Sequence, residues 1–288
     1  MRVLIPGGDG MLGHRLLKHL APRHDVRVTL RRELSAYAGF GIFNDRNAYP
    51  RVDVHSDRLI EVMRAFRPEA VVNCIGLVKQ RPDAEECRPG LEINALYPHR
   101  LADWCRDVKA RLVHLSTDCV FSGQKGNYNE DDPFDAQDLY GQTKFLGEVC
   151  QPPCLTLRTS IVGPELSRKQ GLIEWFLAQK GPINGFTNHI YTGLTTMEMG
   201  RVVEKLLIDH PRASGRYHVS SEPISKHDLL VLVKKKLGLP TEIRPHETPS
   251  PCDRSLDSTR FRQAFDYVPP TWEAMTDELC EELAKERK

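Results

Sequence analysis

The chain has 288 residues, of which 40 are Lys or Arg and 39 are Asp or Glu, giving a formal net charge of +1. This near-neutral balance gives no global reason to expect a nucleic acid or an anionic membrane surface as a partner. The apolar stretch at the N-terminus is too short for a signal peptide, and no segment approaches the roughly 18 apolar residues of a membrane span, so we expect a cytoplasmic protein.

The eight cysteines show no C-x-x-C pair, and the histidines show no H-E-x-x-H motif. Neither pattern therefore has the spacing of a metal site. We expect reduced, unpaired thiols and no bound metal.

Strand and helix patterns alternate through the first 116 residues. The predicted strands are 2–6, 25–30, 69–76 and 111–116, and the predicted helices between them are 12–20, 57–66 and 91–105. Short apolar strands that alternate with amphipathic helices are typical of a parallel sheet covered on both faces. The pattern predicts an α/β fold with a Rossmann-type, doubly wound sheet.

The second half of the chain is less regular. Helices are predicted at 171–179, 197–208, 227–238 and 272–287, a strand at 215–220, and a loop at 244–255. We therefore predict two domains: a dinucleotide-binding domain over 1–160, to which later segments could return, and a smaller α/β substrate-binding lobe over 161–288.

A glycine-rich turn joins the first strand to the first helix. Gly7, Gly10 and Gly13 form a G-x-x-G-x-x-G run, and Met11 and Leu12 lie at the start of the helix. Such a turn lets the backbone approach a pyrophosphate and presents the free N–H groups of the helix. We predict that these five residues bind a dinucleotide; an ordinary tight turn is the alternative.

The end of the second strand is expected to face the adenosine ribose. It carries Arg31 and Arg32, and paired guanidinium donors suit the 2′-phosphate of NADP better than the 2′-hydroxyl of NAD. We predict NADPH as the cofactor, with NADH possible. The alternative is that Arg31 and Arg32 lie in a solvated loop and bind no cofactor. Asp53 and Val54 are candidates for contacting the adenine. For Asp53, an ordinary surface carboxylate is the alternative.

A Y-x-x-x-K pair, Tyr140 and Lys144, lies on a predicted helix. Four residues apart, the two side chains share a helix face, and an ammonium near a phenol stabilises the phenolate and lowers its pKa. Upstream, a strand ends at Thr117, at the rim where open parallel sheets bind ligands. We predict that Thr117, Tyr140 and Lys144 are catalytic and that Tyr140 and Lys144 also bind the cofactor. The alternatives are that Thr117 forms a turn and that Tyr140 and Lys144 are a solvent-facing helix pair.

Together these motifs resemble the extended short-chain dehydrogenase/reductase superfamily, and most closely its dTDP-4-dehydrorhamnose reductase branch. The resemblance spans nearly the whole chain through PGGDGMLG (6–13), NCIG (73–76), EINALYP (92–98), LSTDCVFSG (115–123), YNEDDP (128–133), LYGQTKFLGE (139–148), LRTSIVG (157–163), GRYHVS (215–220) and DRSLDSTRF (253–261).

The resemblance implies a role for each motif. Tyr140 would donate a proton to a sugar keto oxygen that Thr117 polarises, and Lys144 would bind the nicotinamide ribose. The backbone at Cys74, Ile75 and Gly76 would line the adenosine and pyrophosphate side of the cofactor. The branch usually has Tyr and Trp at two positions near the sugar, where this chain has Cys119 and Ile161.

These smaller side chains would leave room for an acetamido group on the sugar. We therefore expect NADPH-dependent reduction of a 4-keto group on a nucleotide-linked 6-deoxyhexose for surface polysaccharide synthesis. The substrate would be dTDP-4-dehydrorhamnose or a UDP-linked 2-acetamido-4-keto-6-deoxyhexose. Lys79 and Arg254 are candidates for binding the diphosphate of this substrate. The alternative for each is an ordinary surface cation.

Two other functions stay open. An epimerase or dehydratase of the same superfamily would share the cofactor fold, but dehydratases place an acidic pair after the Thr117 position, and this chain has Asp118 followed by Cys119. A non-catalytic NADP-binding regulatory subunit, like that of methionine adenosyltransferase, resembles the same branch. A homodimer is possible, since relatives often dimerise.

Overall fold

The computed structural model describes residues 1–77, 86–167 and 169–286. The chain divides into two compact units, and neither is one continuous stretch of sequence. The first unit comprises Met1–Ser116, Gln137–Leu157 and Gly200–Arg216, and the second comprises Thr117–Ala136, Arg158–Met199 and Tyr217–Lys288. That one domain binds a dinucleotide and the other a substrate stays a prediction.

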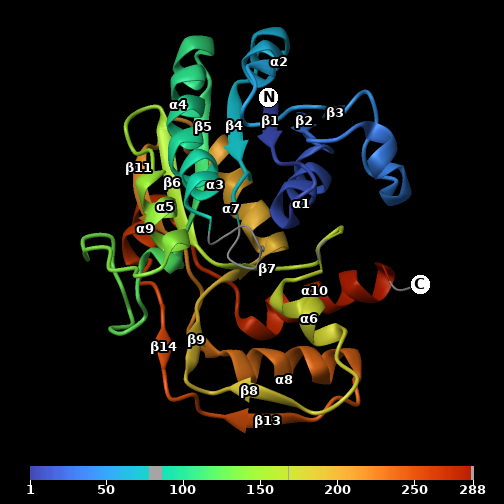
Figure 1. Ribbon diagram of the computed structural model, residues 1–288, viewed down its shortest axis with the longest axis vertical. Helices are drawn as coiled ribbons and strands as arrows, with labels where there is room; N and C mark the ends of the chain where they lie inside the picture. The colour runs from blue at the N-terminus through green and yellow to red at the C-terminus, as the bar shows by residue number, and fades with distance from the viewer. Residues whose placement is uncertain (78–85, 168, 287–288) are drawn as a thin grey trace. The chain divides into compact units, whose positions relative to one another are not determined.

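A seven-stranded sheet forms the centre of the first unit (Figure 1). Its strands are β1 (Arg2–Pro6), β2 (Asp25–Thr29), β3 (Ala48–Tyr49), β4 (Ala70–Asn73), β5 (Arg111–Thr117), β6 (Cys154–Thr159) and β11 (Gly215–His218), in the spatial order β11-β6-β5-β4-β1-β2-β3. The five strands from β3 to β5 in this order pair in parallel. The order runs outward in both directions from β1, which confirms the predicted doubly wound, Rossmann-type fold.

Helices cover both faces of this sheet. They are α1 (Met11–Leu20), α2 (Arg58–Phe66), α4 (Tyr97–Val108), α5 (Leu139–Leu146) and the part of α7 (Thr196–Ile208) that belongs to this unit, with shorter turns η1 (Leu34–Phe40) and α3 (Cys87–Gly90). Leu4, Val71 and Leu112 share one buried cluster with α2 and α4. Because successive side chains of a strand point to opposite faces, Arg111 faces the other layer, and its Nη1 donates to the Leu206 carbonyl of α7 at 2.6 Å.

The predicted helix over 91–105 forms in two parts. Leu91–Leu96 (η3) is a π-helical segment that runs directly into α4. Pro98 lies in the first turn of α4, directly after this segment, and its missing N–H removes one donor from the continuous helical run. The wide π turn lies beside α5, so it belongs to the surroundings of the Tyr140–Lys144 helix.

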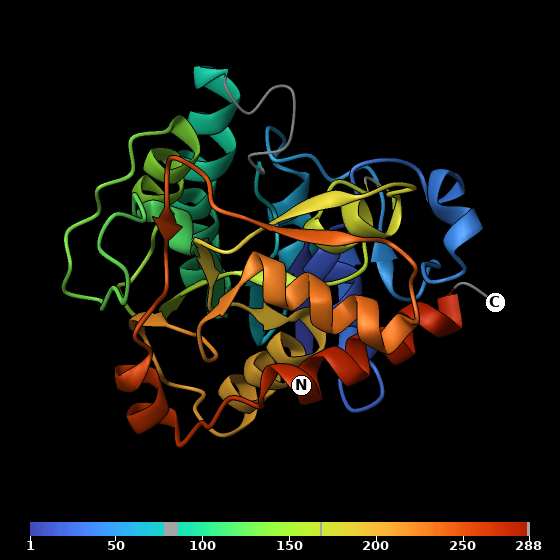
Figure 2. The ribbon, with the colours of Figure 1, turned by 90° about the horizontal axis from the view of Figure 1, so that it is seen from below.

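The second unit is built from short strands and helices. They are η4 (Asp118–Val120), β7 (Ile161–Val162), α6 (Leu172–Leu177), β8 (Ile183–Phe186), β9 (His189–Tyr191), β10 (Leu194–Thr195), β12 (Ile224–Ser225), α8 (Lys226–Leu237), β13 (Ile243–His246), β14 (Cys252–Asp253), α9 (Thr259–Phe265) and α10 (Trp272–Glu286). Helices α8 and α10 pack side by side (Figure 2). This unit is the smaller α/β lobe of the predicted fold.

The prediction of a loop over 244–255 is correct for 247–251 and 254–255 and wrong for 244–246 and 252–253, which lie in strands. β13 pairs with β8, and β14 pairs with β9, both in parallel. Most of β13 is exposed and it contains Pro245, which lacks the N–H of a ladder donor. An edge strand of this kind shows no apolar alternation, so the sequence pattern gave no sign of it.

The cysteines are free thiols, as predicted. Three of them, Cys105, Cys154 and Cys280, are buried, and burial raises the pKa of Cys154 and of Cys280 to about 11. Buried thiols with raised pKa values carry little thiolate at neutral pH and are therefore weak nucleophiles.

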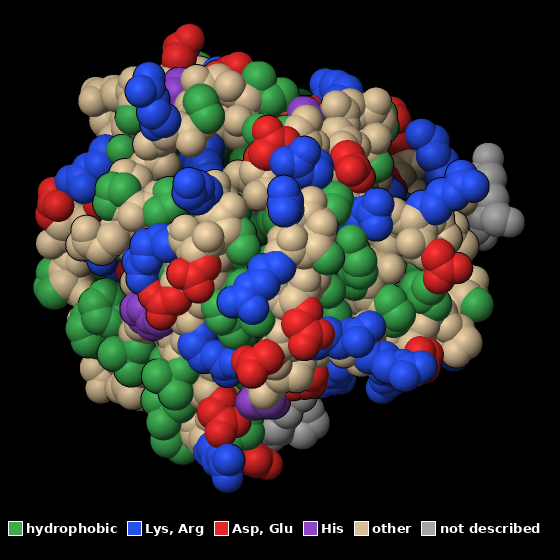
Figure 3. Space-filling view, turned by 90° about the horizontal axis from the view of Figure 1, so that it is seen from above, with side chains coloured by type: hydrophobic (Ala, Val, Ile, Leu, Met, Phe, Trp, Pro, Cys, Tyr) green, Lys and Arg blue, Asp and Glu red, His purple; other side chains and the backbone are tan. Residues whose placement is uncertain are grey.

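Charges of both signs are interspersed on the face shown in Figure 3, where Lys and Arg side chains lie among Asp and Glu. Over 1–77, 86–167 and 169–286, none of the helices combines the length and the apolar composition needed to cross a bilayer.

Candidate active site

The glycine turn folds between β1 and α1. Gly7 has φ of +86°, a left-handed conformation that favours glycine, and the Gly10 N–H donates to the Gly7 carbonyl at 3.1 Å. The Gly8 N–H donates to the Thr29 carbonyl of β2 at 3.0 Å, which ties the turn to the neighbouring strand. Gly10 is the N-cap of α1, and Met11 begins the helix. The amides of this first turn have no intrahelical acceptor and suit an anion.

Two glycines of the turn have no room for a side chain. A Cβ atom on Gly13 would overlap the Gly7 carbonyl, and one on Gly8 would overlap the Val28 side chain. The helix therefore packs directly against the loop backbone. Gly13 was predicted from the motif spacing, whereas Gly8 was not singled out, although the Gly-Gly pair at 7 and 8 is visible in the sequence.

The segment after β2 exposes both predicted arginines, Arg31 and Arg32. Glu33 is paired with Arg51, so the nearest carboxylate to these guanidiniums in sequence is engaged elsewhere. The Arg32 N–H donates to the Tyr37 hydroxyl at 3.3 Å, and that hydroxyl donates to Asp9 Oδ2 of the glycine turn at 3.1 Å. Tyr37 thus links the arginine segment to the glycine turn.

Asp53 has a local structural role. Its Oδ1 accepts a hydrogen bond from the His55 N–H at 2.9 Å, and its carbonyl accepts one from Ser56. Val54 packs against the buried cluster of α2 and α4. Contact of either residue with adenine stays a prediction.

The segment after β4 lies against the glycine turn. The Cys74 N–H donates to the Pro6 carbonyl at 3.0 Å, and a Cβ on Gly7 would lie 3.0 Å from the Cys74 carbonyl oxygen. Ile75 is held by a 3.1 Å bond from its N–H to Asn73 Oδ1. The structure therefore brings Cys74, Ile75 and the glycine turn together between β1 and β4, where the strand order reverses and open α/β sheets bind ligands.

Helix α5 carries the Y-x-x-x-K pair. Asp138 caps it, with Oδ1 accepting from the Gly141 N–H at 2.8 Å. Tyr140 is half-buried, and Lys144 is 6% exposed. The Lys144 Nζ donates to the Leu115 carbonyl of β5 at 2.7 Å and would lie 3.8 Å from a Cβ on Gly76. The ammonium is thus held between the ends of β4 and β5.

Burial lowers the pKa of Lys144 from 10.5 to about 8, and the nearby Glu148 and Cys74 oppose this shift. The same burial raises the pKa of Cys74 to about 12, so that its thiol is neutral near pH 8. Burial and the positive charge of Lys144 hold the pKa of His114 well below 6.5. Within the part of the chain that the structure describes, Lys144 is therefore a cation of reduced proton affinity that lies near two neutral groups, Cys74 and His114, and near the Glu148 carboxylate.

Sequence reasoning assigned no role to several polar residues of this unit, among them Glu148, whose charge raises the proton affinity of Lys144. Ser116 Oγ donates to Glu148 Oε1 at 2.8 Å, and Arg216 Nη1 donates to Glu148 Oε2 at 3.2 Å. The Asn94 side chain, in the π-helical segment, accepts from the Leu77 N–H at 2.8 Å and donates to its carbonyl at 3.1 Å. The motif 139–148 contains Glu148, but no spacing rule connects it to Ser116 and Arg216.

In the second unit, Thr117 begins a short polar turn. Its hydroxyl donates to Asp118 Oδ1 at 3.1 Å and accepts from the Cys119 N–H at 3.1 Å. Asp118 is buried, and burial raises its pKa despite the opposing effects of Arg254 and of hydrogen bonds from Thr117 and Ser160. Thr117 is therefore oriented by the two residues that follow it.

The structure brings two predicted substrate residues together in this unit. Arg254 Nη1 lies 3.7 Å from Cys119 Sγ, and its Nε donates to the Phe121 carbonyl at 2.7 Å. Ile161 lies on β7, opposite Leu194 of β10. Lys79 lies outside the described residues.

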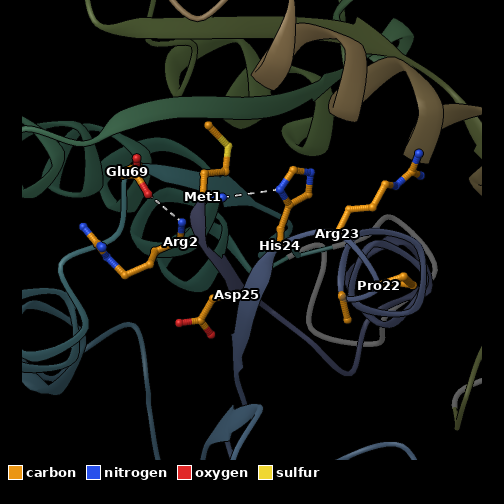
Figure 4. Close-up of a pocket in the computed structure, with 8 residues that line it drawn as sticks. Met1, Arg2, Pro22, Arg23, His24, Asp25 and Glu69 are labelled. Atoms are coloured by element: carbon orange, nitrogen blue, oxygen red, sulfur yellow. Dashed lines mark hydrogen bonds between the residues drawn. The ribbon is translucent and has the colours of Figure 1, made fainter.

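An open hollow of about 600 Å³ lies at the amino ends of β1 and β2, the opposite end of these strands from the glycine turn (Figure 4). Its polar groups bond to one another: the Arg2 N–H donates to Glu69 Oε2 at 2.8 Å, and the Met1 amine lies 3.5 Å from His24 Nδ1. None of the predicted site residues lines it.

A family model described as "RmlD substrate binding domain" matches residues 1–285. The dTDP-4-dehydrorhamnose reductase of Aggregatibacter actinomycetemcomitans is 24% identical over 298 residues, covering 94% of this chain and 96% of that protein. The methionine adenosyltransferase 2 subunit beta of Bos taurus is 26% identical over 264 residues, covering 85% and 75%.

A solved structure of a dTDP-4-dehydrorhamnose reductase from Bacillus anthracis, in complex with NADP, superposes with a TM-score of 0.79. It is 20% identical and covers 98% of this chain and 99% of its own. At this identity the likeness shows the fold.

Proposed function

The chain belongs to the family of the RmlD substrate binding domain, and from this premise we propose that it is an NAD(P)H-dependent sugar-nucleotide oxidoreductase. In this proposal it reduces a 4-keto group on a nucleotide-linked 6-deoxyhexose. The observation that carries the proposal is on α5, where the buried ammonium of Lys144 follows Tyr140 by one helical turn.

The residues of the first unit fit a dinucleotide. The glycine turn excludes side chains at Gly8 and Gly13, and the start of α1 supplies amides for a pyrophosphate. Arg31 and Arg32 are exposed and suit a 2′-phosphate, which favours NADPH over NADH. When bound, NADPH supplies the hydride that adds to the carbonyl carbon of the sugar.

Side chains of this protein supply the proton that the keto oxygen takes up. Tyr140 donates its phenolic proton to the keto oxygen, and the Lys144 ammonium stabilises the phenolate that results. Lys144 also binds the ribose hydroxyls of the nicotinamide half of the cofactor. Thr117 donates a hydrogen bond to the same keto oxygen after its hydroxyl, which bonds to Asp118 in this structure, rotates toward the substrate.

Two substrates fit this chemistry: dTDP-4-dehydrorhamnose and a UDP-linked 2-acetamido-4-keto-6-deoxyhexose, either of which would serve surface polysaccharide synthesis. Cys119 and Ile161 are smaller than the aromatic residues expected there from the resemblance, which favours the acetamido sugar. Turnover of the two substrates by the purified chain distinguishes them. Exclusive use of dTDP-4-dehydrorhamnose would refute the preference for the acetamido sugar.

A non-catalytic regulatory subunit is the second candidate, because of the likeness to a methionine adenosyltransferase subunit. The two functions differ in one measurement. A reductase consumes NADPH in proportion to the 4-hydroxy sugar formed, whereas a regulatory subunit binds NADPH without consuming it with any keto sugar. An epimerase or dehydratase would convert the sugar without net NADPH oxidation. A homodimer stays a prediction.

A further inference from the structure

Glu148 is a carboxylate whose side chain is 3% exposed, just beyond the C-terminal end of α5. Its two oxygens are bound from two strands of the sheet: Ser116 of β5 donates to Oε1 at 2.8 Å, and Arg216 of β11 donates to Oε2 at 3.2 Å. The Arg216 side chain is one-third exposed, so the Arg216–Glu148 ion pair extends from the buried carboxylate to the solvent. A buried carboxylate held on both oxygens has a fixed position.

The same strand end holds Lys144. Its Nζ donates to the carbonyl of Leu115, the residue before Ser116, so the ammonium and the carboxylate are anchored to consecutive residues of β5. Glu148 also follows Lys144 by four residues along the chain. Both charged groups are nearly removed from water, and a buried charge favours a nearby opposite charge.

Among the residues that the structure describes, the other groups that it places near Lys144 supply no negative charge at neutral pH. The Cys74 thiol, from the segment after β4, has a pKa raised to about 12 by burial. His114 of β5 is neutral because burial and Lys144 hold its pKa well below 6.5. Of the two groups that raise the proton affinity of Lys144, only Glu148 is therefore charged near pH 8.

We propose that Glu148 is a positioning residue that keeps Lys144 protonated in the working pH range. Ser116 and Arg216 are the other partners of its carboxylate. The consequence for catalysis rests on the proposed function, since a reductase of this kind needs the ammonium form of Lys144. The effect on protonation does not depend on that function, because it is a property of the free protein.

The test is an NMR titration of the Lys144 Nζ in the free protein with ¹⁵N-labelled lysine, the signal being assigned with Lys144→Arg. Wild type is expected to titrate near pH 8. Glu148→Gln keeps the size of the side chain and removes its charge, and should lower the midpoint by about one pH unit or more. Ser116→Ala removes a hydrogen bond to the same carboxylate but no charge, and should leave the midpoint within about 0.3 pH units.

Arg216→Gln gives a second test, at a one-third exposed position where loss of the fold is not expected. It removes the cation that shares Glu148 with Lys144, so the Lys144 midpoint should rise. The opposite signs expected for Glu148→Gln and Arg216→Gln separate an electrostatic role from loss of packing. An unchanged midpoint in Glu148→Gln, or a lowered midpoint in Arg216→Gln, would overturn the proposal.

A further readout is the affinity for NADPH, measured by binding rather than turnover. In Glu148→Gln the affinity should weaken at lower pH than in wild type, because the ammonium that binds the ribose is lost earlier. If no keto sugar is reduced while the midpoint still falls in Glu148→Gln, the proposed function fails and the role of Glu148 stands. If the keto sugar is reduced but the midpoint is unchanged in Glu148→Gln, the proposed function stands and the role of Glu148 fails.

Discussion

The Nζ atom of Lys144 lies 2.7 Å from the backbone carbonyl oxygen of Leu115 and donates a hydrogen bond to it. A backbone acceptor in a central strand cannot turn away, so the ammonium is fixed relative to the end of β5. One of its three donors is used in this bond, which leaves donors for other partners. The lysine is thus anchored by the sheet while it is carried by α5, and the predictions below depend on that position.

Tyr140→Phe should remove the proton donor with little change in shape. We expect kcat for ketosugar reduction to fall by about 10²–10⁴-fold, the usual contribution of general acid catalysis. The Kd for NADPH should stay within about threefold, since the substitution removes one hydroxyl and most of the predicted cofactor contacts come from other residues. Tyr49→Phe is the control, because Tyr49 lies far from α5 along the chain. It removes a hydroxyl that accepts a hydrogen bond from Arg27 Nη1 at 3.1 Å and should leave kcat unchanged. Steady-state kinetics and NADPH titration check both; equal losses in the two variants would contradict the assignment.

Lys144→Met should change the pH dependence of stability. Between pH 8 and 10.5 the unfolded chain holds a proton on Lys144 that the folded chain has lost, so burial of this lysine destabilises the fold below pH 8 and ceases to do so near 10.5. The free energy of unfolding of Lys144→Met relative to wild type should therefore fall by about 2–3 kcal/mol from pH 7 to pH 10. Urea unfolding at several pH values measures it. A difference that is flat with pH would show that Lys144 is not strongly perturbed.

Arg31→Ala combined with Arg32→Ala should weaken NADPH binding and spare NADH. Each hydrogen bond between charged groups contributes about 1.5–3 kcal/mol, so the Kd for NADPH should rise by about 10–100-fold or more. The Kd for NADH should change by less than about threefold, because NADH lacks the 2′-phosphate. Arg64→Ala, at an exposed position of α2, is the control and should affect neither. Equal losses for both cofactors would assign these arginines another role.

Gly13→Ala should disrupt the phosphate loop. The added methyl would overlap the Gly7 carbonyl, so α1 must move away from the turn. We expect a loss of about 1–3 kcal/mol of stability, typical of overpacking, and at least a tenfold weaker NADPH affinity. Gly39→Ala is the matched control, because its Cβ would meet nothing within 4 Å. Thermal unfolding and NADPH titration compare the two variants; tight NADPH binding by Gly13→Ala would argue against the loop as the pyrophosphate site.

The parts of the fold that were predictable are those encoded by local patterns. β1, the glycine turn and α1 follow from an apolar strand, a glycine spacing and a helical period within the first twenty residues. The π-helical segment Leu91–Leu96 was predicted only as ordinary helix, because its wider turn is set by packing near α5 rather than by composition. The strand β13 was missed because most of it is exposed, and β14 was missed because it has only two residues; neither shows a periodic apolar pattern.

The same distinction holds for the candidate site. Tyr140 and Lys144 are four residues apart and form a recognisable motif, and Gly7 to Gly13 form another. By contrast, Ser116, Glu148 and Arg216 are spread over a hundred residues and meet only because β5, β6 and β11 are neighbours in the sheet. Contacts set by sheet order cannot be derived from spacing along the chain.

The most direct test of the proposed reaction is the fate of the transferred hydrogen. NADPH deuterated at C4 of the nicotinamide, in each stereoisomer, is incubated with the chain and the two 4-keto sugar nucleotides, and the products are examined by NMR and mass spectrometry. One stereoisomer is expected to deliver deuterium to C4 of the product sugar, with one NADPH consumed per carbinol formed. Product without deuterium at C4 from both stereoisomers, or no NADPH oxidation with either sugar, would contradict the assignment of this chain as a reductase.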